Sequence, residues 1–153
     1  MSIFHNSRYI LIVFFSLVCL LPLAAINAQS TEEIILNKEK AALDRWKTGD
    51  TFGFVAIAAT DITYFDPGLK KRVTGLKEFT AHLSSFDGTF SFPGYELLNP
   101  LVQLYDDTGI LTFNFVGYSK DGKKDFWNAT EVYHLVKGEW MIVSSHWSHT
   151  NPE

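Results

Sequence analysis

Residues 110–149 read ILTFNFVGYSKDGKKDFWNATEVYHLVKGEWMIVSSHWSH and are rich in β-branched and aromatic side chains. Two short polar segments, 120–123 and 137–138, interrupt this run with the glycine and polar residues that chain reversals require. The pattern predicts an antiparallel meander with one further strand before it. The four predicted strands are 95–105, 110–118, 125–136 and 139–149.

Helical periodicity characterises much of the chain that precedes the meander. STEE at 30–33 fits a capping box, and apolar residues then recur at helical spacing to residue 47. A second, short helix is expected at 51–59, and the amphipathic segment 75–86 predicts a third. A strand at 61–66 and a short return strand at 71–74 lie between them. Helices followed by antiparallel strands predict an α+β fold with three helices packed on one face of a sheet.

The register of the last hairpin determines which side chains share a face of the sheet. A two-residue turn at 137–138 needs a positive φ at Lys137, so a three-residue loop is favoured. That loop would place Glu131 opposite Val143. The tighter turn would instead place Glu131 opposite Ser144, and the sequence leaves both registers open.

Composition excludes several classes of protein. The chain has 153 residues, which is typical of one domain, and 13 Lys and Arg face 17 Asp and Glu for a net charge of −4. A nucleic-acid partner is not expected, because such proteins normally carry a basic surface. The single cysteine, Cys19, excludes an intramolecular disulfide and a cysteine-based zinc site.

The first 28 residues have the three-part pattern of a secretory signal peptide. Arg8 precedes an apolar run at 9–21, and small residues follow at 24–28. We expect cleavage after Ala28, which leaves a secreted or periplasmic domain of residues 29–153 with no membrane contact. An uncleaved membrane anchor is the alternative, although the run is short for a span of ~20 residues.

Three motifs occur in an order that resembles the NTF2-like superfamily. They are YFDPG at 64–68, RVTG at 72–75, and GEW at 138–140 followed by HWS at 146–148. The sequence is similar to SnoaL-like and ketosteroid-isomerase-like domains and to the association domain of calmodulin-dependent kinase II. The resemblance covers about residues 31–151. It implies a cone-shaped, strongly curved and mostly antiparallel sheet around helices, usually dimeric, with a pocket in the cone.

The resemblance to ketosteroid isomerases implies candidate catalytic positions. These enzymes place a general base before Pro-x-Gly, and Asp66 similarly precedes Pro-Gly here. Their oxyanion-hole tyrosine would fall near Ala42, which cannot donate a hydrogen bond. Their protonated acid would fall near Thr130 or Glu131. The superfamily hosts isomerases, cyclases, dehydratases, binding modules and assembly domains, so membership alone does not imply an activity.

The kinase association domains imply a different pocket. Their pocket arginines would fall near Asn114, Glu131 and Trp147, and none of these is arginine. An anion-binding pocket of that kind is therefore not expected. Trp147 instead matches the tryptophan that precedes serine on the last strand of the isomerases.

Asp66, Glu131 and His146 are the candidate catalytic residues. Asp66 is either a base in an apolar pocket or a turn residue whose side chain binds backbone amides. Glu131 is mid-strand and lies either buried with a partner or on a solvated face. Glu131 or His146 would be the partner of Asp66. His146 and His149 should point to opposite faces of their strand, so neither a metal site nor a cofactor is expected.

Six further residues are candidates for ligand binding. The aromatic ones would form an apolar pocket wall, and ordinary core packing is the alternative. The candidate on the third helix is either a pocket-rim or a core histidine. The six are Trp46, Tyr64, His82, Asn114, Trp127 and Trp147.

Three functional hypotheses follow. The favoured one is binding of a small, largely apolar molecule in the cone, with catalysis absent or unproven. The second is an isomerase, cyclase or dehydratase with Asp66 as general base. The third is a dimerisation or assembly module, with Trp140 and Ile142 on the contacting face of a homodimer.

Overall fold

The computed structural model describes residues 29–151, so the predicted signal peptide at 1–28 lies outside the described residues. Within the described range, no helix combines the length and apolar character needed to cross a membrane. The helices are α1 (Thr31–Lys47), α2 (Phe52–Ile57) and α3 (Leu76–Ser84). The strands are β1 (Ala58–Phe65), β2 (Val73–Thr74), β3 (Gly94–Tyr105), β4 (Thr108–Tyr118), β5 (Lys124–Val136) and β6 (Glu139–His149).

Helix α1 begins with the predicted capping box. The Ser30 hydroxyl accepts a hydrogen bond from the Glu33 amide at 3.2 Å, and the Ser30 amide donates to the Glu33 carboxylate at 3.1 Å. The chain turns after the helix at Gly49, whose φ of 90° favours glycine. A Cβ at Gly49 would lie 2.3 Å from the carbonyl oxygen of Phe90, so this turn also requires the missing side chain.

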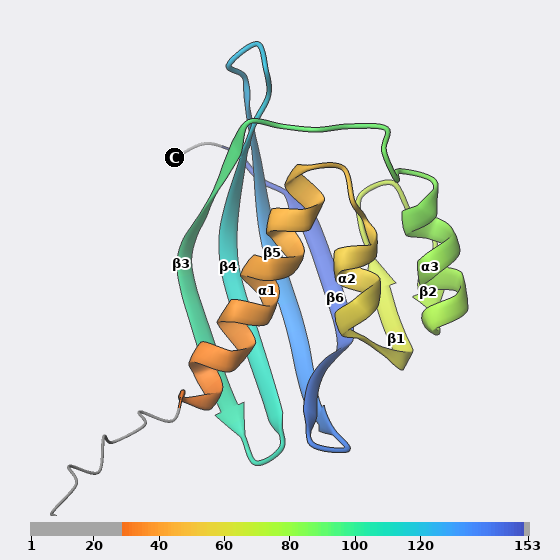
Figure 1. Cartoon of the computed structure of the whole chain (residues 1–153), viewed down its shortest axis with the longest axis vertical. Helices are drawn as coiled ribbons and strands as arrows, with labels where there is room; N and C mark the ends of the chain where they lie inside the picture. Colours follow the sequence, from red (N-terminus) through yellow and green to blue (C-terminus); the bar gives the residue numbers. More distant parts are fainter. Residues whose placement is uncertain (1–28, 152–153) are drawn as a thin grey trace, which may run out of the picture.

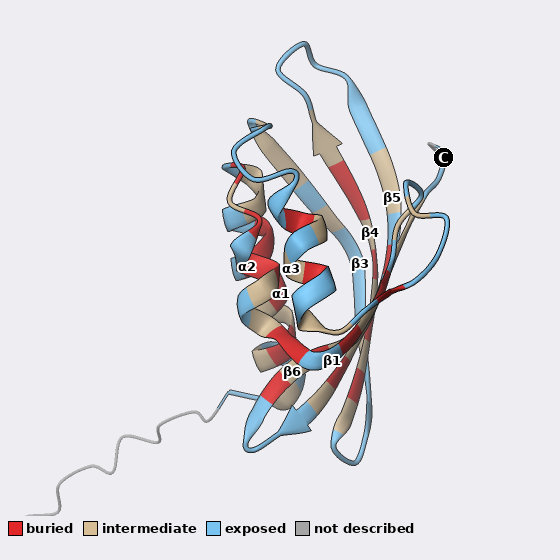
Figure 2. Cartoon of the chain, turned by 90° about the vertical axis from the view of Figure 1, so that its right-hand side faces the viewer, coloured by how far each residue is buried: buried red, intermediate tan, exposed pale blue. Residues whose placement is uncertain are grey.

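The six strands form one sheet in the order β2-β1-β6-β5-β4-β3. Strands β1 and β6 are parallel, and all other neighbours are antiparallel. All three helices lie on one face of this curved sheet, while no described element covers the other face (Figures 1 and 2). The predicted α+β architecture is confirmed. Predicted element boundaries differ from the observed ones by up to three residues; α2, for example, ends at Ile57 because β1 already begins at Ala58.

The core lies between the helices and the inner face of the sheet. Every second residue along the middle of β4 is buried in this core: Leu111, Phe113 and Phe115. Figure 2, which is coloured by burial, shows buried residues in the neighbouring strands as well. From the helices, Ile35 and Phe79 pack into the same core. This side of the sheet is therefore the one that can hold a site shielded from water.

The last hairpin differs from both predicted registers. The turn is the two-residue one, with Val136 opposite Glu139 and φ values of 52° at Lys137 and 88° at Gly138. The matching twist of such a turn offsets the cost of one left-handed lysine. A β-bulge further along β6 then shifts the pairing again, so that Glu131 lies opposite Ser145. The expected pairings of Glu131 with Val143 and with Ser144 are both wrong.

The two-residue turn also reverses the predicted face of the first half of β6. Trp140 and Ile142 are 8% and 2% exposed and belong to the core, so their predicted place on an exposed contact face is wrong. Met141 and Val143 are half-buried and alternate with these two core residues on the same strand. The bulge after Ile142 then returns Ser145 and Trp147 to the predicted inner face, because side chains alternate along a strand.

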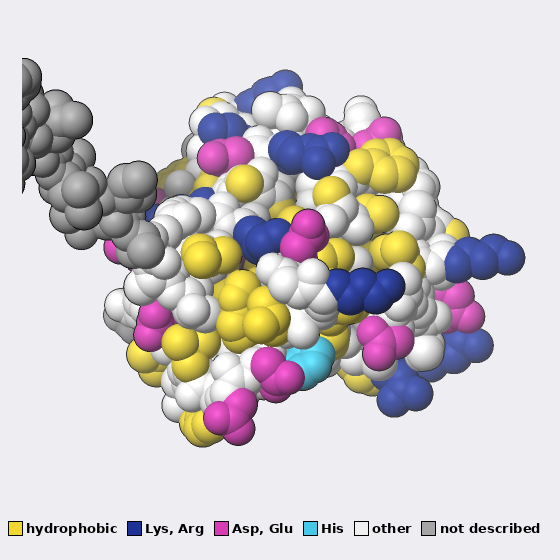
Figure 3. Space-filling view, turned by 60° about the horizontal axis from the view of Figure 1, so that its bottom comes forward, with side chains coloured by type: hydrophobic (Ala, Val, Ile, Leu, Met, Phe, Trp, Pro, Cys, Tyr) yellow, Lys and Arg dark blue, Asp and Glu magenta, His cyan; other side chains and the backbone are white. Residues whose placement is uncertain are grey.

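Exposed hydrophobic side chains also occur at one end of the molecule. The β3–β4 and β5–β6 turns lie at this end, which Figure 3 brings forward. Hydrophobic groups are visible there between acidic and basic ones rather than as a single uniform surface. Among the exposed residues of the strands that lead into these turns are Leu104, Tyr105, Leu135 and Val136.

Candidate binding cavity

A cavity of about 1150 Å³ lies between the helices and the inner face of the sheet. Trp46, Phe79 and Trp127 line this space rather than fill it. Its rim includes exposed residues of the β4–β5 turn, from Ser119 to Asp125. The described residues therefore enclose an aromatic cavity that is large enough for a small molecule.

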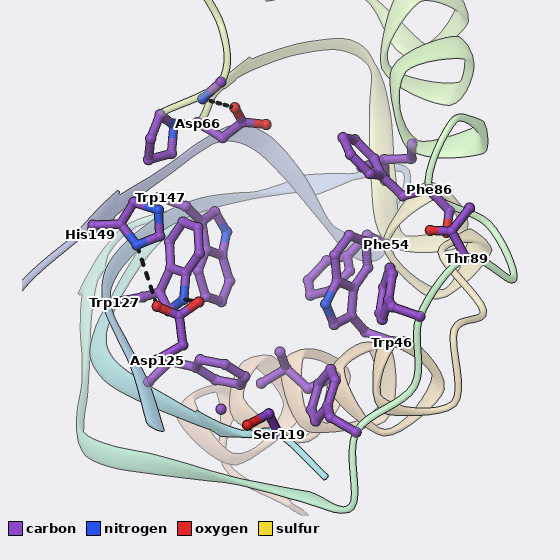
Figure 4. A pocket seen from close by; sticks show the side chains of 18 of the residues that line it. Trp46, Phe54, Asp66, Phe86, Thr89, Ser119, Asp125, Trp127, Trp147 and His149 are labelled. Carbon is purple, nitrogen blue, oxygen red and sulfur yellow. Dashed lines mark hydrogen bonds and ion pairs between the residues drawn. The ribbon is translucent and has the colours of Figure 1, made fainter. Parts of the chain in front are cut away.

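Two groups of aromatic rings line opposite sides of the cavity, and they meet where Phe54 contacts Trp147 edge to face with ring centroids 6.4 Å apart (Figure 4). On one wall, Trp147 contacts Trp127 edge to face, with ring centroids 6.4 Å apart. On the other wall, Trp46 packs against Phe54 at 5.8 Å and Phe90 at 4.9 Å. Edge-to-face contacts of this kind fix ring orientations, so each wall presents a defined apolar surface.

Asp66 lies at the cavity at the end of β1 and has a partner for each carboxylate oxygen. Oδ1 accepts a hydrogen bond from the Gly68 amide at 2.7 Å, which forms the turn (Figure 4). Oδ2 lies 2.8 Å from Nε2 of His82 on α3. The turn contact and the position at the cavity coexist, so the two interpretations of Asp66 are compatible.

His82 and Tyr64 are the side-chain neighbours of the Asp66 carboxylate. His82 itself does not line the cavity, and its ring packs 5.5 Å from Tyr64 and 5.2 Å from Phe86. Tyr64 lines the cavity and is 9% exposed. Burial raises the pKa of the Tyr64 phenol far above its usual value, and the neighbouring Asp66 carboxylate adds to the increase.

Glu131 is completely buried behind the wall that contains Trp147. Its Oε1 accepts hydrogen bonds from the Ser145 hydroxyl at 3.0 Å and from the Trp147 indole at 2.8 Å. Both donors line the cavity, but Glu131 does not. Burial, together with the negative charge of Glu39, raises the pKa of Glu131 well above its usual value. Burial therefore favours the neutral form of this side chain, which holds two residues of the wall through Oε1.

Glu39 is a buried acid that the sequence analysis did not single out. Its Oε2 accepts a hydrogen bond from the Tyr133 hydroxyl at 2.7 Å. Burial raises its pKa to about 7, although the Tyr133 hydrogen bond acts in the opposite direction. Glu39 lies four residues after Ile35 and three before Ala42, so helical spacing placed it on the apolar stripe of α1. Oε1 of Glu39 and Oε2 of Glu131 have no hydrogen-bond partner within residues 29–151.

Two candidate residues lie away from the cavity. His146 is exposed and packs beside Phe65, with ring centroids 6.0 Å apart. Asn114 is in a row of amides across three strands, where it contacts Asn99 at 3.1 Å and Asn128 at 2.8 Å. Neither lines the cavity, so the structure does not bring them together with Asp66.

His149 lines the cavity, although it was not among the predicted site residues. Its ring lies over Trp127, with centroids 3.8 Å apart, and its Nδ1 is 3.6 Å from Asp125 (Figure 4). His149 and His146 are on opposite faces of β6, as predicted, because residues three apart alternate. Within the part of the chain that the structure describes, no group of three His, Cys, Asp or Glu residues is arranged to hold a metal.

Solved structures with this architecture identify the family. A candidate ketosteroid isomerase from Parabacteroides distasonis is 31% identical, with a TM-score of 0.73. The match covers 81% of this chain and 91% of that one. This chain belongs to the NTF2-like superfamily. No protein-family model matches the sequence, and no curated protein matches it.

Two further structures place this NTF2-like chain within a diverse group. An NTF2-like protein of unknown function from Pseudomonas putida is 25% identical, with a TM-score of 0.71, and the match covers 82% of this chain and 92% of that one. The CaMKII hub of S. rosetta is 23% identical, with a TM-score of 0.66, over 80% of this chain and 99% of the hub. The likeness to the hub concerns the fold alone.

The polar side chains at the cavity of this NTF2-like chain differ in part from those that the resemblance to ketosteroid isomerases implies. Position 42 on α1 holds a buried alanine, so no hydroxyl extends from there toward the cavity. Asp66 and its partner His82 provide a proton acceptor beside the cavity. Glu131 contributes through Ser145 and Trp147 rather than by direct contact. The arrangement places an apolar cavity beside one acid–histidine pair.

Proposed function

We propose that this NTF2-like protein binds a small, largely apolar molecule in its cone. The cavity of about 1150 Å³ between two aromatic walls is the observation that carries the proposal. Side chains that line a space of this size lack the packing partners that a solid core would give them. An apolar ligand that buries about 200 Å² would recover roughly 5 kcal/mol before the costs of association.

Thermal unfolding with a panel of apolar ring compounds tests this function. We expect at least one compound to raise the midpoint, and Trp127→Ala to weaken its binding because a wall ring is lost. His146→Ala is the matched control, since that aromatic side chain is exposed and does not line the cavity. The absence of any shift across the panel, or equal binding by Trp127→Ala, would contradict the proposal.

Catalysis by Asp66 is the second candidate function, favoured by the 2.8 Å contact between its carboxylate and His82. In an isomerisation, Asp66 would take a proton from a carbon next to a carbonyl and return it to another carbon of the same molecule. The Parabacteroides distasonis relative, a candidate ketosteroid isomerase, supports this reaction class. Such a step also needs a donor for the developing oxyanion, which Ala42 does not supply.

The catalytic proposal is tested with Asp66→Asn on any compound that the protein isomerises or dehydrates. Asparagine can still accept the turn hydrogen bond from Gly68 but cannot accept a proton from carbon. We expect turnover to fall by at least a hundredfold. Full turnover by this variant would rule out Asp66 as the base.

We further propose a homodimer that uses the sheet face left uncovered by the helices. The hub domain from S. rosetta, which has the same fold, supports assembly as a use of this architecture. The half-buried residues Met141 and Val143 of β6 replace Trp140 and Ile142 as contact candidates. Sedimentation should give a dimer that Val143→Asp dissociates, and a monomer at high concentration would refute this arrangement.

We also propose that residues 1–28 act as a cleaved export signal. The basic, apolar and small-residue segments of the sequence support it. Expression in a host with an export pathway should yield a protein whose mass corresponds to a start at Gln29. Retention of the segment in a membrane fraction would favour the uncleaved anchor instead.

A further inference from the structure

The mouth of the cavity carries a local excess of positive charge. We use this name for the exposed β4–β5 turn at 119–125, which reads SKDGKKD and lines the cavity with every residue except Gly122. The turn holds three lysines against two aspartates, whereas the whole chain has a net charge of −4. The cavity therefore meets solvent beside a segment whose charge is opposite to that of the protein as a whole.

Both aspartates of the mouth already have partners. A carboxylate oxygen of Asp121 lies 2.8 Å from the Lys123 ammonium. Asp125 accepts the Trp127 indole N–H at 2.8 Å, and its other oxygen is 3.6 Å from Nδ1 of His149. These acids are thus held by groups of the protein itself.

Two of the three lysines at the mouth lack a carboxylate partner. Within residues 29–151, neither Lys120 nor Lys124 has a carboxylate oxygen within ion-pair distance. The Lys124 ammonium lies 5.2 Å from the ring centroid of Tyr118, which itself lines the cavity. This cation–π contact favours a position of the ammonium beside the cavity. Both lysines can therefore bind an anionic group at the mouth.

The far side of the cavity is unsuited to an anion. Asp66 lies there, on the side opposite Ser119, as Figure 4 shows. A second carboxylate beside Asp66 would be repelled by a like charge. The side chains between the two ends include the rings of Trp46 and Trp127, which offer apolar contact. An anion with an apolar body would therefore bind in one orientation, with its charge at the mouth.

We propose that the ligand of this cavity is an amphipathic carboxylate, whose apolar body lies between the aromatic rings and whose charged end binds Lys120 and Lys124. The inference rests on the proposed ligand-binding function and names the ligand class for that cavity. The apolar body leaves water, while the carboxylate remains at an exposed position and need not be desolvated. Exposed ammonium–carboxylate contacts are individually weak, so the lysines determine preference and orientation more than total affinity.

Fluorescence titration with 1-pyrenebutanoic acid and 1-pyrenebutanol tests the proposal, because these probes share a ring system and differ in the terminal group. At pH 7 and low salt, we expect the wild-type protein to bind the acid roughly fivefold more tightly. The Lys120→Gln, Lys124→Gln double variant should lose this preference and bind the alcohol as before. Lys40→Gln, Lys77→Gln is the matched control, since it removes the same charge at exposed helical residues that do not line the cavity.

The salt dependence of binding by the wild-type protein keeps the test independent of the variants. Raising the salt concentration from ~20 mM to ~500 mM screens exposed charges. Binding of the acid should weaken by roughly the fivefold preference, and binding of the alcohol should not weaken. Equal salt responses of the two probes would overturn the proposal.

The outcomes separate this inference from the proposed function. Binding of the alcohol with no preference for the acid, or a preference that the Lys120 and Lys124 double variant retains, would overturn the inference alone. Equal loss of the preference in the control variant would also overturn it, because net charge rather than the mouth would then be responsible. Binding of neither probe would overturn the inference, and the apolar-ligand panel would then decide the proposed function separately.

Discussion

Asp66 at the cavity and Glu131 behind its wall are both acids, but their surroundings are assembled differently. The partners of Asp66 are Gly68 and His82, two and sixteen residues along the chain, and they occupy both oxygens. Glu131 is held by residues of the neighbouring strand, and its second oxygen has no partner in the described part of the chain. A third acid, Glu39 of α1, adds negative charge from the opposite layer.

The difference shows how burial determines the role of a carboxyl group. Asp66 is 14% exposed at its side chain and combines a backbone donor with an imidazole. Glu131 and Glu39 are completely buried, so desolvation favours their neutral forms. The rim acid is therefore available for chemistry with a bound molecule, while the core acids serve as hydrogen-bonding parts of the wall and core.

The largest expected effect comes from removing the Glu131 carboxyl. Glu131→Ala should lower the free energy of unfolding by about 4 kcal/mol, because two donors lose their acceptor and a cavity opens. Glu131→Gln should cost less than about 1 kcal/mol, since its amide retains an acceptor oxygen and mimics a neutral acid. Urea unfolding at pH 7 measures both, and equal losses would show that Glu131 is held as a charged group.

Glu39 should make the free energy of unfolding depend on pH. Its pKa rises from 4.5 to about 7 in the folded protein, so folding favours the protonated form. The contribution of Glu39 to the free energy of unfolding is complete below pH 4.5. It is lost as the pH rises toward 7, which lowers the free energy of unfolding by about 3 kcal/mol. Urea unfolding across this window should show the decline, and Glu39→Gln should remove its share. A wild-type profile with no decline would contradict the assignment.

A smaller effect is expected from Tyr133→Phe, which removes the hydroxyl that donates to Glu39. Loss of this buried hydrogen bond should cost about 1.5 kcal/mol. The same hydrogen bond lowers the pKa of Glu39, so its removal should extend the pH-dependent decline to higher pH. The unfolding profile of this variant is the measurement, and a decline that moves to lower pH would refute the contact.

The smallest effect is expected at the rim. Asp66→Asn should lower the free energy of unfolding by less than about 1 kcal/mol, because its amide oxygen can still accept from the Gly68 amide. Urea unfolding alongside Glu131→Ala gives the comparison directly. A loss at Asp66 as large as that at Glu131 would contradict the separation of rim and core acids.

Local features of the fold could be predicted from the sequence. The capping box at Ser30 depends on residues a few positions apart, and it occurs as expected. Asp66 and the three cavity tryptophans were also identified, because turn residues and aromatic strands leave local patterns. These elements position most of the cavity lining.

Long-range features could not be predicted in the same way. The bulge in β6 depends on how the strand fits its neighbours, so the pairing of Glu131 with Ser145 had no local signal. Glu39 was visible as an acid on an apolar stripe, but its contact with Tyr133 spans 94 residues. His146 is exposed and Asn114 is half-buried, and both lie outside the cavity because they alternate with inward-facing neighbours on β6 and β4.

A crystal structure grown with the compound of the apolar panel that most raises the unfolding midpoint would test the central claim, that this cone holds a site for an apolar ring compound. We predict ring-shaped density between Trp46 and Trp127, in contact with the aromatic side chains that line the cavity. A structure in which these two tryptophans close onto each other and leave no space beside Asp66 would contradict it.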